Sequence, residues 1–201
     1  MKIEKGDFIE LEFTGKCEGE IFDTTNNEIA KKIFNKEVKP IKIIVGERMV
    51  IDGLDKAIEG KEINKIYKIK LKPKEAFGDR RKELIKTVPL NAFKDKNLVR
   101  EGNLLLIDGI LVKILKVASG RVLIDMNHPL AGKEIEYEFK ILRKIENDDE
   151  KIKTIAEFFG IKDYEIEKND EKIVIKLKKM NKNFEELLKK YIKNIEITKI
   201  E

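Results

Sequence analysis

Residues 45–60, VGERMVIDGLDKAIEG, are the stretch that decides the fold. An apolar run at residues 41–45 leads into it, and its glycines mark places where the backbone turns sharply or takes a positive φ. The pattern predicts a strand, a tight loop and one short helix, which would bring Val50, Ile51 and Leu54 to a single concave apolar place. Such a place is a binding-site hypothesis, although most short stretches of this kind only build hydrophobic core.

The composition is that of a folded protein with a highly charged surface. Of the 201 residues, 41% are hydrophobic, which is enough to bury a core, and 40% are charged. The length allows one large domain or a few small ones. Lysine and glutamate dominate the charged residues and glutamine is absent, a balance reported for hyperthermophiles, so we expect a thermophilic protein.

The charge distribution argues against a nucleic-acid-binding protein, despite the net charge of +5. Residues 147–201 carry 13 Lys and Arg and 13 Asp and Glu, so this part is neutral. Elsewhere the two signs alternate along the chain, as on a solvated surface, and the sequence has no basic stripe with interleaved aromatic residues. We therefore expect no nucleic-acid partner.

Cysteine and histidine are too scarce for a disulfide framework or a histidine-rich metal site. Cys17 is the one cysteine, His128 is the one histidine, and neither CxxC nor HxxxH spacing occurs. We predict no metal and no cofactor, and a structural hydrogen-bonding role for His128. The first residues, MKIEKGDFIE, are charged from the start, and no run approaches the ~20 apolar residues of a membrane span. The expected location is the cytoplasm, with no membrane partner.

Alternating strands flank the central stretch on both sides. In residues 7–16, apolar side chains from Ile9 to Phe13 alternate with glutamates, as in a half-buried strand. Residues 15–19 are then predicted to form a turn, and residues 65–72 alternate again as a second strand. Together with the short central helix, these features predict an α+β fold in which an antiparallel sheet wraps on a helix.

Four motifs in order carry a family resemblance. They are FTGKCEGEIFDTT at residues 13–25, IKIIVGERMVIDGLDKAIEG at 41–60, PKEAFGDR at 73–80 and IEYEFKILRKIE at 135–146. Their order and spacing resemble those of FKBP-type peptidyl-prolyl cis-trans isomerases. The resemblance implies an isomerase domain made of residues 1–83 and 131–146, in which the last motif is the strand that closes the fold.

Residues 84–130 are longer than the short flap of the minimal family members. Within them, two apolar runs at 104–107 and 110–115 flank Asp108-Gly109, which predicts a β-hairpin. An insertion at this place resembles the insert-in-flap domain of long bacterial and archaeal members, which binds unfolded polypeptide as a chaperone. We expect a small all-β domain whose apolar residues either bind clients or form its own core. The residues concerned are Val88, Leu90, Phe93, Leu98 and Val99.

Residues 147–201 predict a small C-terminal α/β domain. An acidic run at 147–150 suits a helix N-terminus, and the pattern that follows predicts two helices and three strands, with a turn at residues 169–170. The last strand includes Ile200 and reaches Glu201 without a turn signal, as in a chain that continues. A unit of about 55 residues buries little core alone, so we expect it to pack against a second copy in a homodimer.

The resemblance also implies an apolar prolyl pocket with a carboxylate beside it. Leu54 is the expected platform for the proline ring, Asp23 the expected buried carboxylate, and Phe77 is expected on the side of the substrate carbonyl. Phe13 and Phe77 stand where many members have tyrosine, and Leu54 stands where minimal members have tryptophan. Two hydroxyls are therefore missing, and weaker macrolide binding is expected. The full set is Phe13, Phe22, Asp23, Ile41, Val50, Ile51, Leu54, Phe77 and Tyr137.

These features predict a peptidyl-prolyl isomerase with chaperone activity. An X-Pro bond rotates over a barrier of about 18–20 kcal/mol, and an apolar pocket that favours the twisted amide needs no nucleophile or metal. The expected partners are unfolded or partly folded proteins with exposed X-Pro bonds and apolar segments. The alternative is a non-catalytic holdase or interaction module on the same fold, which the missing hydroxyls suggest.

Overall fold

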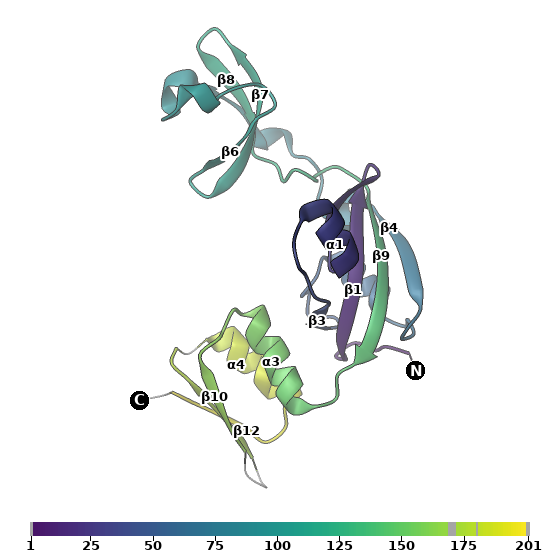
Figure 1. The fold of residues 1–201 in the computed structure, drawn as a ribbon. Coiled ribbons are helices and arrows are strands. Elements are labelled where there is room, and N and C mark those ends of the chain that lie inside the picture. Colours follow the sequence, from purple (N-terminus) through teal and green to yellow (C-terminus); the bar gives the residue numbers. More distant parts are fainter. Residues whose placement is uncertain (1, 169–171, 180, 200–201) are drawn as a thin grey trace. The chain divides into compact units, whose positions relative to one another are not determined.

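The computed structural model describes residues 2–168, 172–179 and 181–199. The chain divides into two compact units (Figure 1). The first unit consists of Met1–Lys70 and Glu136–Glu201, and the second unit is Leu71–Ile135. In the described residues, no helix is both long and apolar enough to cross a membrane.

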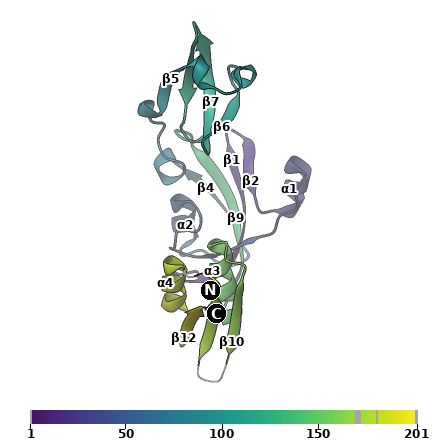
Figure 2. The same cartoon turned by 90° about the vertical axis from the view of Figure 1, so that its left-hand side faces the viewer.

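The first unit is built on a five-stranded sheet whose central strand is β1. The strands are β1 (Phe8–Cys17), β2 (Glu20–Thr24), β3 (Ile41–Ile44), β4 (Ile66–Leu71) and β9 (Ile135–Lys144). They lie in the order β2-β1-β9-β4 (Figure 2). Strand β3 pairs with the first half of β1. Both β2 and β3 run antiparallel to β1, which confirms the antiparallel strands predicted from the alternating pattern.

Two short helices accompany this sheet, α1 (Asn27–Phe34) and α2 (Asp52–Ile58). The α1 helix begins after Asn26, whose side-chain oxygen accepts the Ile29 N–H at 3.1 Å. The α2 helix is the one predicted from the central stretch. It buries Leu54 and Ile58, which are four residues apart and therefore lie on one helix face.

The first turn of the chain differs from the expectation. Strand β1 continues through Gly15 to Cys17, so Gly15 belongs to a strand and not to a turn. The pairing with β2 shifts in register between Gly15 and Lys16. The turn itself is tighter and falls at Glu18 and Gly19, whose φ angles of 54° and 85° are both positive. A glycine inside a strand indicates a bulge or a close approach by another group, and Gly15 has both.

The second unit contains an antiparallel sheet of four strands. They are β5 (Ile85–Pro89), β6 (Leu104–Ile107), β7 (Ile110–Ala118) and β8 (Arg121–Asp125), in the order β5-β8-β7-β6. The predicted hairpin is confirmed: Asp108 and Gly109 join β6 to β7 with φ angles of 49° and 79°, as a type I′ turn requires. Short 3-10 turns lie at Pro73–Glu75, Lys82–Leu84, Leu90–Ala92 and Lys96–Leu98.

The C-terminal part of the first unit combines two helices with three strands. They are α3 (Asp148–Phe158), α4 (Lys182–Tyr191), β10 (Tyr164–Lys168), β11 (Ile173–Leu177) and β12 (Ile195–Lys199). Strand β11 lies between β10, to which it is antiparallel, and β12, to which it is parallel. Asn147 and Asn181 cap the two helices with their side-chain oxygens. The predicted turn at residues 169–170 and the strand end at Ile200 and Glu201 lie outside the described residues.

One hydrophobic cluster joins this C-terminal part to the five-stranded sheet. Phe8 of β1 and Ile44 of β3, which are paired across the two strands, are 3% and 0% exposed within it. Phe8 packs here because side chains alternate along a strand, so it points to the opposite face of β1 from Ile9. The buried members are Phe8, Ile44, Ile145, Ile152, Ile155, Ala156, Ile175, Leu177, Phe184, Leu188 and Ile192. The five-stranded sheet of the same chain therefore covers an apolar face of the C-terminal part. The expectation from the sequence was that a second copy of the chain covers this part.

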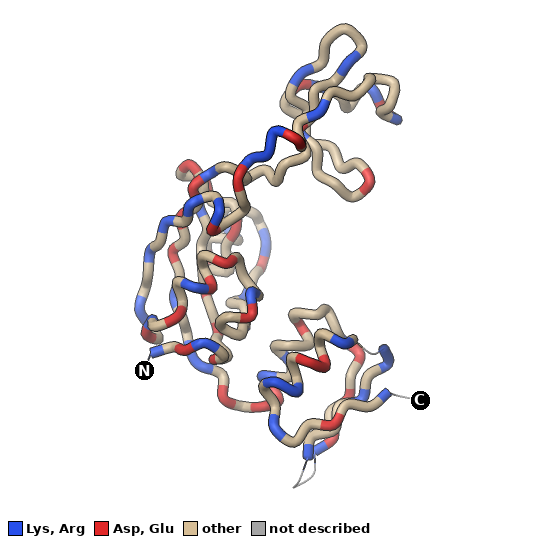
Figure 3. The backbone as a smooth tube through the Cα atoms, turned by 180° about the vertical axis from the view of Figure 1, so that it is seen from behind, with Lys and Arg blue, Asp and Glu red and all other residues tan. Residues whose placement is uncertain are grey.

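Ion pairs also link α3 of the C-terminal part to the strands of the five-stranded sheet. Arg143 donates from Nη1 to Glu150 at 2.9 Å and from Nε to Glu10 at 2.6 Å, and Lys42 lies 2.8 Å from Glu150. The hydrogen bond from Arg143, followed by that from Lys42, lowers the pKa of Glu150 to about 2. Charges of both signs are interleaved along the traced backbone, as the sequence pattern predicts (Figure 3).

Glu150→Gln is expected to make stability less dependent on pH. Folding lowers the pKa of Glu150 from 4.5 to about 2, so the charged carboxylate stabilises the fold above about pH 4.5, and this contribution is lost as the pH falls toward 2. In urea unfolding followed by circular dichroism, we expect a loss of about 1 kcal/mol at pH 7 that shrinks toward pH 2. The control is Glu157→Gln, which removes only an exposed pair 3.9 Å from Lys153. A difference from wild type that is equal at pH 2 and pH 7 would contradict this account.

Candidate functional site

An aromatic cluster lies across three neighbouring strands of the first unit. Tyr137 of β9 meets Phe13 of β1 with ring centroids 5.6 Å apart, and it meets Phe22 of β2 at 6.0 Å. The rings cross at 67° and 84°, the edge-to-face geometry that aromatic pairs favour. Phe13 and Tyr137 are 8% and 4% exposed, and Phe22 is half-buried. The structure thus brings three of the predicted pocket residues together.

Gly15 makes this arrangement possible. A Cβ atom at this position would lie 2.7 Å from Cζ of Phe22 and 2.9 Å from Cε1 of Tyr137, closer than carbon atoms approach. The two rings therefore use the space that any larger residue would fill. The sequence analysis missed this role because it placed Gly15 in a turn; the available signal was a glycine inside an alternating run.

Gly15→Ala is expected to displace the cluster. Overpacking a site of this kind costs about 1–3 kcal/mol, because side chains must leave their preferred rotamers. We expect that loss in urea unfolding, together with changed ring-proton shifts for Phe22 and Tyr137 in NMR spectra. Glu12→Ala, on the same strand, serves as the control. Wild-type ring shifts in Gly15→Ala would show that the cluster does not depend on the missing Cβ.

Two buried threonines fix the backbone of Phe13, and the sequence analysis did not assign them to the site. The Phe13 N–H donates to Thr25 Oγ1 at 2.8 Å, and the Thr25 N–H donates to the Phe13 carbonyl at 2.9 Å. Thr24 Oγ1 lies 2.8 Å from Thr14 Oγ1 on the paired strand. The signal was present in the sequence, since threonine hydroxyls commonly bond to nearby backbone groups.

Asp23 differs from the expectation of a buried carboxylate, because its side chain is exposed. It lies on β2, an edge strand of its sheet, and is paired with Gly15 next to the shift in strand register. Its charge still reaches the cluster: burial, and then the nearby Asp23 carboxylate, raise the pKa of Tyr137. Tyr137 thus brings a hydroxyl to a cluster in which Phe13 lacks one.

The other predicted wall residues of the first unit come from β3, the following loop and α2. Val50 and Ile51 are half-buried in the loop just before α2, and Ile41 is half-buried at the start of β3, opposite Leu11. Leu54 is 1% exposed, so it supports the wall from within α2, and its contact with a proline ring stays a prediction.

Phe77 belongs to the second unit, where it stacks on His128 with ring centroids 4.5 Å apart and planes within 1°. The Nδ1 atom of His128 accepts the Leu130 N–H at 3.2 Å, a structural hydrogen bond of the kind predicted for this histidine. The predicted place of Phe77 on the carbonyl side of a prolyl pocket stays a prediction.

The predicted client-binding residues of the second unit divide into two groups. Val99 is buried at 6% exposure in the unit's core and Leu90 packs against that core, so these two match the alternative of an ordinary hydrophobic core. Val88, Phe93 and Leu98 line a cavity of about 500 Å³, and Leu98 is 52% exposed. Val88 and Phe93 also pack against that core, so Leu98 is the one predicted client-binding residue that is largely exposed.

The β6–β7 hairpin carries a further apolar surface that was not among the predicted sites. Leu104, Leu106 and Leu111 are 53%, 74% and 41% exposed, and they share one face of the hairpin because Leu106 is paired with Leu111. Leu106 also lines the cavity of the second unit. The available signal was a strand that is apolar at all four positions, LLLI, because successive side chains point to opposite faces and only one face packs on the core.

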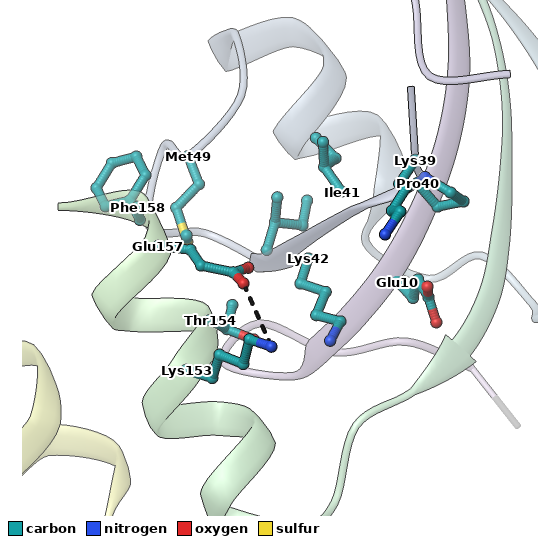
Figure 4. Close-up of a pocket in the computed structure, with 11 residues that line it drawn as sticks. Glu10, Lys39, Pro40, Ile41, Lys42, Met49, Lys153, Thr154, Glu157 and Phe158 are labelled. Carbon is teal, nitrogen blue, oxygen red and sulfur yellow. Dashed lines mark ion pairs between the residues drawn. The ribbon is translucent and has the colours of Figure 1, made fainter. Parts of the chain in front are cut away.

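A separate cavity of about 500 Å³ lies in the first unit, lined by β3, α3 and Met49 (Figure 4). Ile41 and Lys42 line it from β3, and Phe158, 45% exposed, lines it from α3. Its polar side chains are mostly paired with one another or with nearby charges, as Lys42 is with Glu150. The described residues contain no group of three or more His, Cys, Asp or Glu side chains that could hold a metal ion.

Comparison with known proteins decides the family. The family model described as FKBP-type peptidyl-prolyl cis-trans isomerase matches residues 1–94. The short-type peptidyl-prolyl cis-trans isomerase of Methanocaldococcus jannaschii is 35% identical over 144 residues, which cover 69% of this chain and 92% of that protein. The chain belongs to the FKBP-type peptidyl-prolyl cis-trans isomerase family. The family and the enzyme class predicted from the four motifs are thereby confirmed, as is the FKBP fold with its antiparallel sheets and few helices.

More distant FKBP relatives carry the name SlyD. The FKBP-type isomerase SlyD of Helicobacter pylori is 29% identical over 139 residues, which cover 67% of this chain and 74% of that protein. SlyD of Haemophilus influenzae is 27% identical over 108 residues, and this match spans 57% of its own length. The chain thus spans only about half of some of its FKBP relatives.

Proposed function

We propose that this FKBP-family chain catalyses cis-trans isomerisation of X-Pro bonds in unfolded or partly folded polypeptides. The observation that carries the proposal is the edge-to-face cluster of Phe13, Phe22 and Tyr137. Rotation about an X-Pro bond must break amide resonance over a barrier of about 18–20 kcal/mol. The twisted amide has less charge separation than the planar amide, so it loses less on entering an apolar aromatic site. Neither a nucleophile nor a metal is required.

The polar edge of the cluster would orient the substrate. A tyrosine hydroxyl is protonated at neutral pH at its ordinary pKa, and burial and then the Asp23 carboxylate raise the pKa of Tyr137 further. A protonated hydroxyl can donate a hydrogen bond to a substrate carbonyl whose charge changes during rotation. In this proposal Tyr137 replaces one of the hydroxyls that Phe13 and Phe77 lack.

The second unit would hold the polypeptide client and give the protein chaperone activity. The exposed side chains of Leu104, Leu106 and Leu111 offer an apolar surface on one face of the hairpin, and Leu98 and Leu106 line the cavity of about 500 Å³. A client bound there stays tethered to the catalytic unit through the chain itself, which raises the local concentration of its prolyl bonds. A modest catalytic pocket then becomes efficient on protein substrates.

The proposed domain organisation follows the sequence analysis. Residues 1–83 and 131–146 would form the isomerase domain, residues 84–130 an inserted all-β domain, and residues 147–201 a C-terminal α/β domain. We propose that a second copy pairs with this C-terminal domain, because β10 and β12 each have one unpaired edge among the described strands. Light scattering at micromolar concentration tests this, and a monomer would refute it.

The experiment that separates this function from a non-catalytic holdase uses a protein whose refolding is limited by one prolyl bond. We expect catalytic amounts of the chain to accelerate the slow refolding phase, which otherwise lasts tens to hundreds of seconds. An alternative holdase would suppress aggregation of the same client at equimolar amounts without changing that phase. Unchanged refolding kinetics would reject the isomerase proposal.

A further inference from the structure

The loop from Gly46 to Ile51 connects β3 to α2 and carries two predicted walls of the prolyl pocket, Val50 and Ile51. Asp55 of α2 anchors one side of it. Its carboxylate is 5% exposed and accepts the Gly46 N–H at 2.9 Å and the Arg48 N–H at 3.0 Å. These bonds fix the first half of the loop against the helix below it.

A second anchor comes from the other end of the chain. The Glu47 carboxylate accepts a hydrogen bond from the Tyr191 hydroxyl at 2.6 Å and from Lys190 Nζ at 2.5 Å, both at Oε1. Lys190 and Tyr191 are the last two residues of α4. The loop beside the pocket is therefore held by a helix more than one hundred and forty residues away in the sequence.

The second anchor itself packs against the N-terminal part of the chain. The Tyr191 ring meets Phe8 edge-to-face, with centroids 5.3 Å apart, and lies against Gly6, where a Cβ would be 3.4 Å from the ring. Burial acts to raise the pKa of Glu47, but the hydrogen bonds from Lys190 and Tyr191 outweigh it, so the pKa is lowered. Burial, followed by the bond to Glu47, raises the pKa of Tyr191 to about 12. The bonds are thus charge-assisted at neutral pH, which is the strong kind.

We propose that Glu47, Lys190 and Tyr191 form a clamp through which the C-terminal part of the chain positions the pocket loop for prolyl isomerisation. This inference rests on the proposed function. A loop fixed at one side only samples several conformations, and the apparent substrate affinity falls in proportion to the competent fraction. The clamp residues do not contact the substrate; they act through Val50 and Ile51 as positioning residues.

The test measures kinetics on a proline-containing tetrapeptide with the full chain. Tyr191→Phe, which keeps the ring on Phe8, and Glu47→Gln are each expected to raise KM about three- to tenfold while kcat changes less than about twofold. In the double variant the second change should raise KM little further, because both changes remove the same interaction between Glu47 and Tyr191. The control is Lys189→Met, which changes an exposed lysine two positions before Tyr191 on α4.

A readout independent of activity follows the loop directly. The Arg48 amide, which donates to Asp55, should exchange its hydrogen several-fold faster in Glu47→Gln than in wild type, while the core of the sheet keeps its protection. Wild-type KM and wild-type Arg48 exchange in both single variants would overturn the clamp. Absence of isomerisation by the wild-type chain would instead overturn the proposed function, and Arg48 exchange would still decide the clamp.

Discussion

Removal of residues 85–125 is expected to cut catalysis of proline-limited refolding by at least about tenfold while leaving tetrapeptide isomerisation within about twofold of wild type. The deletion takes out the four-stranded sheet from β5 to β8. The two residues that flank the deletion already lie together, because the Met126 N–H donates to the Leu84 carbonyl at 3.0 Å. A two-residue Asn-Gly turn can therefore close the gap. The two substrates respond differently because only a long client gains from being held.

A variant with the sheet intact keeps this prediction testable if the deletion disturbs folding. Leu104→Ser combined with Leu106→Ser removes two side chains that are 53% and 74% exposed, so stability should change little. Catalysed refolding should fall toward the value of the deletion variant. The matched control is Lys113→Ser, on the neighbouring strand β7 and opposite Leu104. Equal losses on tetrapeptide and protein substrates would contradict a holding role for the second unit.

Phe184→Ala is expected to lower the free energy of unfolding by about 3–5 kcal/mol, the largest stability effect that we predict. Phe184 is 0% exposed, sits in the cluster that joins the C-terminal part to β1 and β3, and meets Phe159 with centroids 6.0 Å apart. The substitution removes its ring and leaves a cavity between two parts that share one core. Because Phe8 and Ile44 lie in that core, the whole first unit should unfold in a single transition at lower urea concentration.

The control for this prediction is another phenylalanine of the same region. Phe158 is 45% exposed at the end of α3, so Phe158→Ala should cost well under about 1 kcal/mol. Two separate transitions in Phe184→Ala, with the one for the five-stranded sheet unchanged, would show that the C-terminal part folds independently of that sheet.

Local patterns predicted most of the secondary structure, because their signals are contained in a few neighbouring residues. Alternation at residues 7–16 predicted β1, and Asp108-Gly109 predicted the hairpin of β6 and β7. Gly15 was placed wrongly because a glycine in a strand and a glycine in a turn look alike until the rings above it are known. The shared core around Phe8 was missed for a similar reason, since the alternating pattern does not say what covers the second face of a strand.

The site was predictable to the extent that the family resemblance implied a shared pocket for Phe13, Phe22 and Tyr137, which the structure brings together. The exposure of Asp23 was not predictable, because it depends on β2 being the edge strand of the folded sheet. The bond between Glu47 and Tyr191 joins positions 144 residues apart, and no local pattern could indicate it. The features of the site that the sequence did not predict are thus those that depend on tertiary contacts.

The central claim is that the aromatic cluster accelerates X-Pro rotation, and two-dimensional exchange NMR on an Ala-Leu-Pro-Phe peptide tests it most directly. With a catalytic amount of wild-type chain, we predict cis–trans exchange cross-peaks within about a second, against tens to hundreds of seconds for the free peptide. In Phe22→Ala, which truncates the half-buried ring of the cluster, we predict that the exchange slows at least about tenfold. An exchange rate with the wild-type chain equal to that of the peptide alone would contradict the account.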